Sequence, residues 1–149
     1  MVIQRIQSVY LLIAVILMAI FAFFPVLTFE VGSKSFVYGA LETGNVGMTH
    51  IDPLMLVLVL LVALLALIDI FLYKNLQRQM TVCFVDIIIA LSMLVAIGIQ
   101  TYILSTHEIL NLRLQWFLLL PVFAIIFLML AHKAMSRDKK ALRDSDRLR

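Results

Sequence analysis

The sequence predicts an all-α membrane protein with four transmembrane helices, a short outer β-hairpin-like loop between the first two helices, and a helical cytoplasmic tail. Hydrophobic residues make up 64% of the 149 residues and charged residues only 14%, whereas soluble domains carry about a quarter charged residues. Four apolar stretches divide the chain, and the basic residues beside them are unevenly distributed. These observations favour a single membrane domain over residues 1–149.

The four apolar stretches are long enough to cross a bilayer. About 20 helical residues, each rising 1.5 Å, span a hydrocarbon core of roughly 30 Å. The first stretch has no charge between Arg5 and Glu30, and it is longer than the apolar part of a signal peptide. We therefore interpret it as an uncleaved helix. Transmembrane helices are expected at about residues 6–28, 53–73, 80–105 and 114–132.

Two prolines bear on the second and fourth helices. Pro53 follows Asp52, and this order is typical of an N-cap residue with proline at the first helical position. Pro121 lies inside the fourth stretch. There it is expected to kink the helix or to loosen one backbone hydrogen bond.

The distribution of Lys and Arg predicts which side of the membrane each end occupies. Ten of the twelve basic residues flank one side of the predicted helices, and only Lys34 and Arg113 flank the other. Positively charged flanks tend to stay in the cytoplasm. A multi-pass protein with both termini cytoplasmic is therefore expected, with Trp116 and Tyr102 near the outer interface, where amphipathic rings are favoured.

The outer loop over residues 29–52 is the longest connection. Two segments rich in β-formers, "LTFEV" and "SFVY", flank Gly32, Ser33 and Lys34, which predicts a short hairpin. A lone two-stranded hairpin is marginal in water, so we expect it to rest on the outer helix ends. The other connections, "YKNLQRQ" and "STHEILNLR", are short and leave no room for a second folded domain.

The tail over residues 133–149 carries most of the positive charge. Seven basic and three acidic residues follow Ala131, and the segment contains neither proline nor glycine. Lys140 and Asp144 stand at a helical neighbour spacing, so the fourth helix is expected to continue into the cytoplasm. The tail could enforce topology, contact anionic lipid at about 1 kcal/mol per basic residue, or bind a protein partner.

Three segments resemble one family. The start "IQRIQSVYLL", the inner loop "FLYKNLQRQ" and the end "RDKKALRDSDRLR" are similar to the DUF4293 family of small, uncharacterised membrane proteins from Bacteroidota. The resemblance covers essentially the whole chain. It implies four helices in a bacterial inner membrane and supplies neither an activity nor functional residues, because the function of the family is unknown.

Two carboxylates fall inside apolar stretches, where ionisable groups are costly and call for an explanation. Asp69 lies near the end of the second predicted helix and Asp86 near the start of the third. Folding the two helices about Leu76–Gln77 places the carboxylates at nearly the same depth. They are therefore expected to face each other or a shared partner.

Two interpretations of this acidic pair stay open. The functional one is a proton or cation relay, or a polar cavity that opens inward. The structural one is neutralisation by nearby cations that snorkel towards the pair, with hydrogen bonds from neighbouring polar side chains. The candidate cations are Arg5, Lys74 and Arg78, and the candidate donors are Gln4 and Tyr73. The outer half of the third helix offers few polar groups, which favours the structural interpretation.

No motif in the sequence predicts catalysis, a cofactor or a metal. His50, Asp52, His107 and Glu108 lie on the outer side but lack a metal-ligand spacing. Cys83 is expected to be a buried, unreactive thiol on the face of Asp86. The tail has no aromatic residue to stack on a base. We expect neither an enzyme nor a nucleic-acid-binding protein.

The sequence favours a structural or accessory subunit of the inner membrane that contacts a membrane or cytoplasmic protein through its inner loop and tail. The alternative is a small proton- or ion-coupled transport component that acts as a homo-oligomer and uses Asp69 and Asp86. The candidates for partner or lipid contact are the basic residues of the cytoplasmic side: Lys74, Arg78, Arg137, Lys139, Lys140, Arg143, Arg147 and Arg149.

Overall fold

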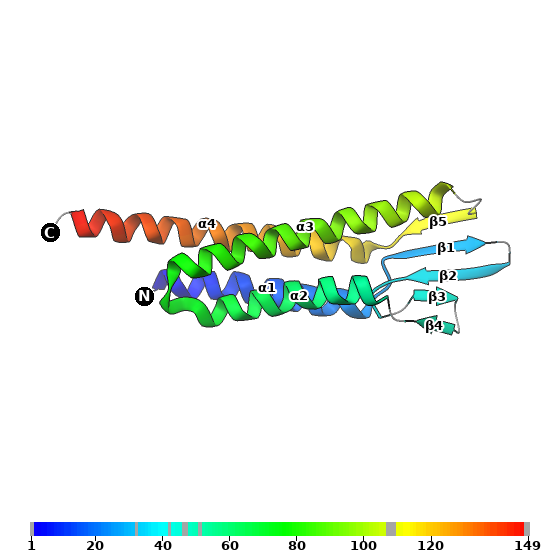
Figure 1. Cartoon of the computed structure of the whole chain (residues 1–149), viewed down its shortest axis with the longest axis horizontal. Coiled ribbons are helices and arrows are strands. Elements are labelled where there is room, and N and C mark those ends of the chain that lie inside the picture. Colours follow the sequence, from blue (N-terminus) through cyan, green and yellow to red (C-terminus); the bar gives the residue numbers. More distant parts are fainter. Residues whose placement is uncertain are drawn as a thin grey trace.

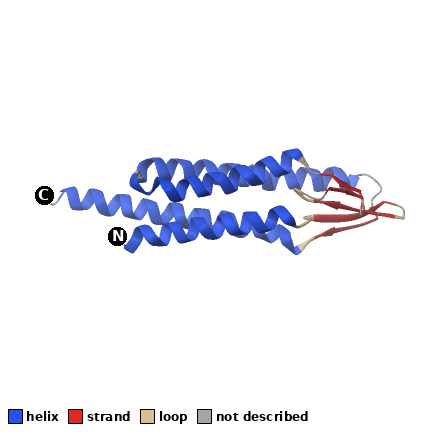
Figure 2. Ribbon diagram, turned by 90° about the horizontal axis from the view of Figure 1, so that it is seen from below, coloured by secondary structure: helices blue, strands red, loops and turns tan. Residues whose placement is uncertain are grey.

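The computed structural model describes residues 2–31, 33–41, 43–45, 48–50, 52–106 and 110–147, with side chains except at residues 2–5, 31, 45, 48–50, 104, 110–112, 146 and 147. Four long helices run up and down beside one another, and a small sheet covers one end of them (Figures 1 and 2). The helices are α1 (Val2–Phe23), α2 (Pro53–Phe71), α3 (Leu76–Thr106) and α4 (Leu119–Arg147). Each contains a segment long and apolar enough to cross a membrane. The chain is thus a multi-pass membrane protein, as predicted.

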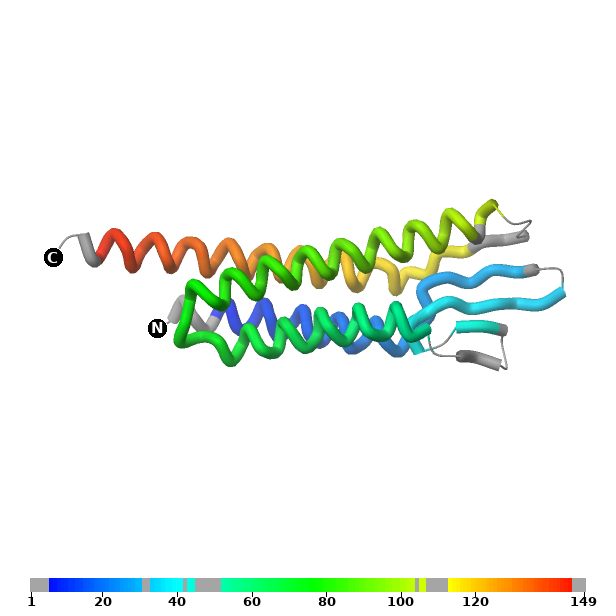
Figure 3. Tube along the Cα trace, in the orientation of Figure 1, coloured from blue at the N-terminus to red at the C-terminus, as the bar shows by residue number. Residues whose placement is uncertain are grey.

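The bundle has two different ends. The start of α1, the connection between α2 and α3, and the last turns of α4 share one end, which we call the charged end (Figure 3). The sheet lies at the other, capped end. Around the bundle, α1 packs on α2 and α4, and α3 packs on the same two helices. The predicted continuation of the fourth helix through the tail is confirmed, because α4 runs without a break to Arg147.

Helix boundaries differ from the prediction at three places. The first helix ends at Phe23, about five residues early, because residues 27–31 pair in a strand beyond Pro25. The second is followed by the 3-10 turn η1 (Leu72–Lys74), after which α3 begins at Leu76 rather than near residue 80. The fourth begins at Leu119, after the 3-10 turn η2 (Trp116–Leu118).

Pro121 is the third residue of α4. The first four N–H groups of an α-helix have no partner within that helix, so the missing N–H of proline costs no intrahelical hydrogen bond at this position. The expectation that Pro121 disrupts the helix is therefore wrong. The cause is the late start of α4, which places the proline in the first turn.

One narrow seam on each helix faces the interior. Its buried positions recur at alternating spacings of three and four residues, the pattern of a left-handed bundle. Buried alanines, such as Ala14, Ala66 and Ala90, let the backbones approach closely. The seam consists of Gln7, Leu11, Ala14, Met18 and Phe21 in α1; Met55, Val59, Val62, Ala66 and Asp69 in α2; Gln79, Cys83, Asp86, Ala90, Met93 and Ile97 in α3; and Pro121, Ala124, Leu128, Ala131 and Met135 in α4.

The remaining helix surface is apolar and exposed. Large side chains such as Leu12, Leu64, Val95 and Met129 point outward, which is the surface expected of helices that have lipid around them. Trp116 and Tyr102 are 84% and 70% exposed near the capped end.

The predicted hairpin is confirmed as β1 (Leu27–Val31) and β2 (Lys34–Tyr38). It belongs to a larger antiparallel sheet than the sequence suggested, with the strand order β4-β3-β2-β1-β5. The additional strands are β3 (Thr43–Asn45), β4 (Met48–His50) and β5 (Leu110–Leu114). The last of these comes from the loop after α3 and pairs with β1, so it ties both outer connections into one cap.

Backbone hydrogen bonds join this cap to the residues that connect it with the helices. The Val26 N–H donates to the Tyr38 carbonyl at 2.7 Å, and the Gln115 N–H donates to the Val26 carbonyl at 2.9 Å. The Asp52 side chain accepts from the N–H groups of Leu54 and Met55 at 3.0 and 3.2 Å. The predicted N-cap with Pro53 at the first position is therefore confirmed.

Asp52 also interacts with Tyr38, which is buried in the cap. Burial, and then the hydrogen bond and the negative charge of Asp52, raise the pKa of the Tyr38 phenol. The phenol therefore stays protonated and donates to the carboxylate. One side chain thus starts α2 and fastens it to β2.

We predict that Asp52→Ala destabilises the protein by about 1–2 kcal/mol, because it removes the N-cap and leaves the Tyr38 hydroxyl without its acceptor. Asp52→Asn, which keeps an accepting oxygen, should lose less. The measurement is thermal unfolding of the purified protein in mild detergent. The control is Asp144→Ala on the exposed surface of α4, and equal losses in Asp52→Ala and this control would contradict the assigned role.

Candidate functional site

The buried polar side chains gather towards the charged end of the bundle. Among the described residues they are Gln7, Asp69, Gln79 and Asp86, each no more than 1% exposed. All four occupy seam positions. Three of them lie seven residues from an apolar seam residue, as Gln7 does from Ala14, and the fourth, Gln79, lies seven residues from Asp86. The interior is therefore polar near this end and apolar towards the sheet.

Asp69 and Asp86 form the centre of this polar region. Both side chains are fully buried, and among the described residues neither carboxylate oxygen of either residue has a hydrogen-bond partner. The two carboxylates are close enough to interact electrostatically, and Cys83 interacts with both. The structure thus brings together the two aspartates that the sequence singled out.

The expected neutralisation of Asp69 and Asp86 by nearby cations is wrong for those candidate residues whose side chains the structure describes. Lys74 and Arg78 are exposed, and Tyr73 is 51% exposed. None of the three bonds to a buried carboxylate, whose oxygens have no partner in the described part of the chain. The side chains of Gln4 and Arg5 lie outside the described residues.

Three other polar groups link the helices around the carboxylates. The Gln79 amide of α3 donates to the Asp69 carbonyl of α2 at 3.0 Å, and the Cys83 thiol donates to the Leu128 carbonyl of α4 at 3.5 Å. His132 of α4 packs on the ring of Phe84 with centroids 6.1 Å apart. Its buried Nδ1 has no hydrogen-bond partner in the described part of the chain.

No metal site forms among the described residues, in which no three His, Cys, Asp or Glu side chains cluster suitably. Asp52, one of the outer candidates, caps α2 instead. His107 and Glu108 lie outside the described residues, as does the side chain of His50.

The tail is fastened to the bundle at two points. The Gln7 amide of α1 donates to the Asp138 carboxylate of α4. Lys139 donates to the Gln77 side-chain carbonyl in the first turn of α3. Beyond this pair of contacts, every side chain from residue 140 to residue 145 is exposed.

The basic candidates share the charged end. Lys74, Arg78, Arg137, Lys140 and Arg143 are exposed there, and Lys139 is half-buried. Arg147 is described in its backbone only, and Arg149 lies outside the described residues.

Comparison with known families assigns the chain. A family model described as a domain of unknown function, DUF4293, matches residues 3–148. The chain belongs to the DUF4293 family. This confirms the resemblance seen in the two ends and the inner loop, and the match includes the bundle, the cap and the tail of the DUF4293 domain alike. No curated protein matches the chain, and no solved structure matches it.

Sequence reasoning found the two aspartates but missed Gln7 and Gln79 as interior residues. Both lie near helix ends, where a polar side chain is normally expected to contact the membrane–water interface. The signal was their spacing: Gln79, Asp86 and Met93 are seven residues apart, as are Gln7 and Ala14. A seven-residue repeat keeps side chains on one seam of a bundle.

We predict that Asp86→Asn leaves the DUF4293 protein at least as stable as the unchanged chain, with a gain of about 1–2 kcal/mol. The substitution replaces a fully buried ionisable group, for which the described residues supply no hydrogen-bond partner, by a neutral amide of similar shape. Burial of an ionisable group without a partner is costly. Thermal unfolding in detergent at neutral pH measures the change, with Asp144→Asn as the exposed control. A clear loss of stability confined to Asp86→Asn would show that the carboxylate has a stabilising partner.

Proposed function

We propose that this DUF4293 protein is a non-enzymatic accessory subunit of a bacterial inner-membrane assembly. In this proposal a protein partner docks on the projecting end of α4 together with the α2–α3 connection. The observation that carries the proposal is the extension of α4 past the other three helices (Figure 1). Every side chain from Lys140 to Ser145 is exposed on this extension.

A projecting helix of this kind gains little stability in water from its own residues. Short helical segments without tertiary contacts are marginal, and most helical stability in proteins comes from packing of an apolar face. Leu142 is 60% exposed on this extension. In this proposal Leu142 is the apolar anchor that enters a groove on the partner, as apolar side chains do where a helix binds in a groove.

The charges on the extension favour a protein over a lipid surface as its partner. Asp144 directly follows Arg143 and lies four residues after Lys140. A carboxylate beside basic residues weakens adsorption to anionic lipid, whereas a surface of mixed charge gives specificity at a protein interface. The hydrogen bonds at Asp138 and Lys139 hold the base of the extension in a fixed direction, and this preorganisation lowers the cost of binding.

The proposal places the charged end in the cytoplasm. The support is the basic bias: exposed Lys74, Arg78, Lys133 and Arg137 lie at the charged end, and basic flanks favour the cytoplasmic side. Both termini then face the cytoplasm, and the sheet faces outward.

A second candidate function is a proton- or cation-coupled transport component, which acts as a homo-oligomer. The observation that favours it is the burial of Asp69 and Asp86 without a hydrogen-bond partner among the described residues, since ionisable groups at membrane depth often serve such paths. The seam nearer the sheet weighs against it. There the interior of α3 continues with Ala90, Met93 and Ile97, which offer no polar step across the membrane.

We predict that Leu142→Asp abolishes co-purification of a stoichiometric partner from native membranes in mild detergent. The matched control is Ser145→Asp, which adds the same charge on the same exposed segment and keeps the leucine. Quantitative mass spectrometry of the purified complexes gives the result. If both variants retain the partner while Asp86→Asn alone abolishes the cellular function, the accessory-subunit proposal fails and the transport candidate replaces it.

We predict that Ser33→Cys, in the β1–β2 turn, reacts in spheroplasts with a maleimide that cannot cross membranes. Ser145→Cys should react only after lysis. Native Cys83 is fully buried, so its background labelling should be low. Labelling of Ser145→Cys before lysis, with Ser33→Cys protected, would place the charged end outside and overturn the proposed orientation.

A further inference from the structure

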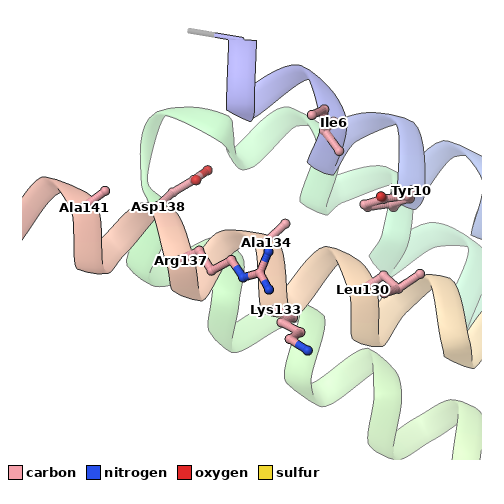
Figure 4. Close-up of a pocket in the computed structure, with 8 residues that line it drawn as sticks. All are labelled: Ile6, Tyr10, Leu130, Lys133, Ala134, Arg137, Asp138 and Ala141. Atoms are coloured by element: carbon pink, nitrogen blue, oxygen red, sulfur yellow. The ribbon is translucent and has the colours of Figure 1, made fainter.

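A groove opens between α1 and α4 at the charged end of the bundle. Its volume is about 500 Å³. Figure 4 shows its walls, with Ile6 and Tyr10 on α1 and Leu130 and Ala134 on α4. Lys133, Arg137, Asp138 and Ala141 complete its lining. The groove thus joins an apolar wall on the membrane side to a basic rim nearer the tail.

The two basic residues of the rim act as a pair. Lys133 and Arg137 are four residues apart and therefore lie on one face of α4. The Arg137 guanidinium turns back along the helix towards Ala134 and Lys133 (Figure 4). The one acidic residue of the lining, Asp138, accepts a hydrogen bond from Gln7. With two basic residues against one acidic residue, the lining keeps a net positive charge beside the apolar wall.

A second groove of about 610 Å³ lies on the other side of this part of α4, between α4 and α3. Phe84, Ile87, Ile126, Met129 and His132 line it, and it shares Leu130 and Lys133 with the first groove. Two mainly apolar grooves therefore meet at Leu130 and Lys133, which line both of them.

We propose that this part of α4 binds one anionic diacyl phospholipid. Its headgroup phosphate contacts Lys133 and Arg137, and its two acyl chains lie in the grooves on either side of Leu130. Basic pockets between transmembrane helices are suited to anionic headgroups, and a guanidinium can make paired hydrogen bonds to a phosphate. This site adjoins the partner surface proposed over residues 140–145 and shares Ala141 with it.

The surroundings of the grooves favour a lipid over a soluble anion. Met129, which lines the second groove, is 57% exposed, and Val9, next to Tyr10 in the chain, is 52% exposed. Both belong to the apolar helix surface that bilayer lipids would cover. A free phosphate ion would use the basic pair and leave both grooves unfilled. A diacyl lipid matches the basic rim and the two grooves together.

The test uses the full-length protein in nanodiscs that contain phosphatidylcholine and phosphatidylglycerol in equal amounts. The protein is then extracted in mild detergent, and native mass spectrometry counts the lipids that remain bound. The unchanged chain should retain one phosphatidylglycerol. The variant Lys133→Gln/Arg137→Gln should bind it about 30-fold more weakly, from two basic contacts near the membrane surface.

The control variant Lys140→Gln/Arg143→Gln removes the same charge from exposed positions further along α4, and it should retain the lipid. Equal loss in both double variants would overturn the proposal, because it would show adsorption to general positive charge. The absence of phosphatidylglycerol enrichment on the unchanged chain would also overturn it.

The grooves are tested without a change of charge. Ala134→Trp fills the first groove from α4, and Ile6→Trp fills it from α1, where the side chain is exposed and folding is not at risk. Each should lower phosphatidylglycerol retention severalfold. If both variants retain the lipid while inorganic phosphate displaces it, the site recognises a phosphate group alone and the lipid proposal fails.

Discussion

The hydrocarbon core of a bilayer offers no water, so every backbone N–H and C=O within it must bond inside the chain. Helices meet this requirement locally, whereas an open sheet cannot, because its edge strands keep unpaired groups. The five-stranded sheet has two such edges, at β4 and β5. It lies at one end of the bundle, where α3 extends to the level of the strands (Figures 1 and 2). The connections between helix and strand are short at β1 and at the end of β5. Pro25 lies between α1 and β1, and Gln115 lies between β5 and η2. The same requirement therefore fixes both the bundle and the position of its cap.

Lipid also removes the hydrophobic drive that holds soluble helices together, because the outer surface is as apolar as the interior. Close packing along the narrow seam, with alanines such as Ala14 and Ala90, must supply much of the association between helices. Polar seam residues add to it where they bond, as Gln79 does to the Asp69 carbonyl. Asp69 and Asp86 do not follow this logic, since their carboxylates are buried without a hydrogen-bond partner in the described part of the chain. The energetic cost of burying these two carboxyl groups falls in the half of the bundle nearest the charged end. The interior of the half nearest the sheet is filled by apolar side chains.

The sequence predicted the features that depend on neighbouring residues. Apolar length marked four helices, Asp52 with Pro53 marked the start of α2, and the β1–β2 hairpin followed from two β-prone segments around a turn. It did not predict β5, because the partner of Leu110–Leu114 lies about eighty residues earlier in the chain and a five-residue segment carries no signal for that pairing. Nor did it predict the interior role of Gln79. The lipid-facing side of each helix is as apolar as the seam, so composition alone cannot show which face is buried.

The helix α4 carries two kinds of basic surface, and their difference follows from what lies beside each. Lys133 and Arg137 stand above apolar grooves formed with α1 and α3, and the acidic residue beside them, Asp138, accepts a hydrogen bond from Gln7 of the bundle. Positive charge beside an apolar groove is complementary to a lipid with an anionic head. Lys140 and Arg143 stand past the last contacts with the bundle, next to Asp144 and around the exposed Leu142. Mixed charge around an apolar anchor is complementary to a protein surface of equally mixed charge. The two surfaces can therefore be occupied together, and a lipid held at Lys133 and Arg137 would further fix the direction in which the partner surface projects.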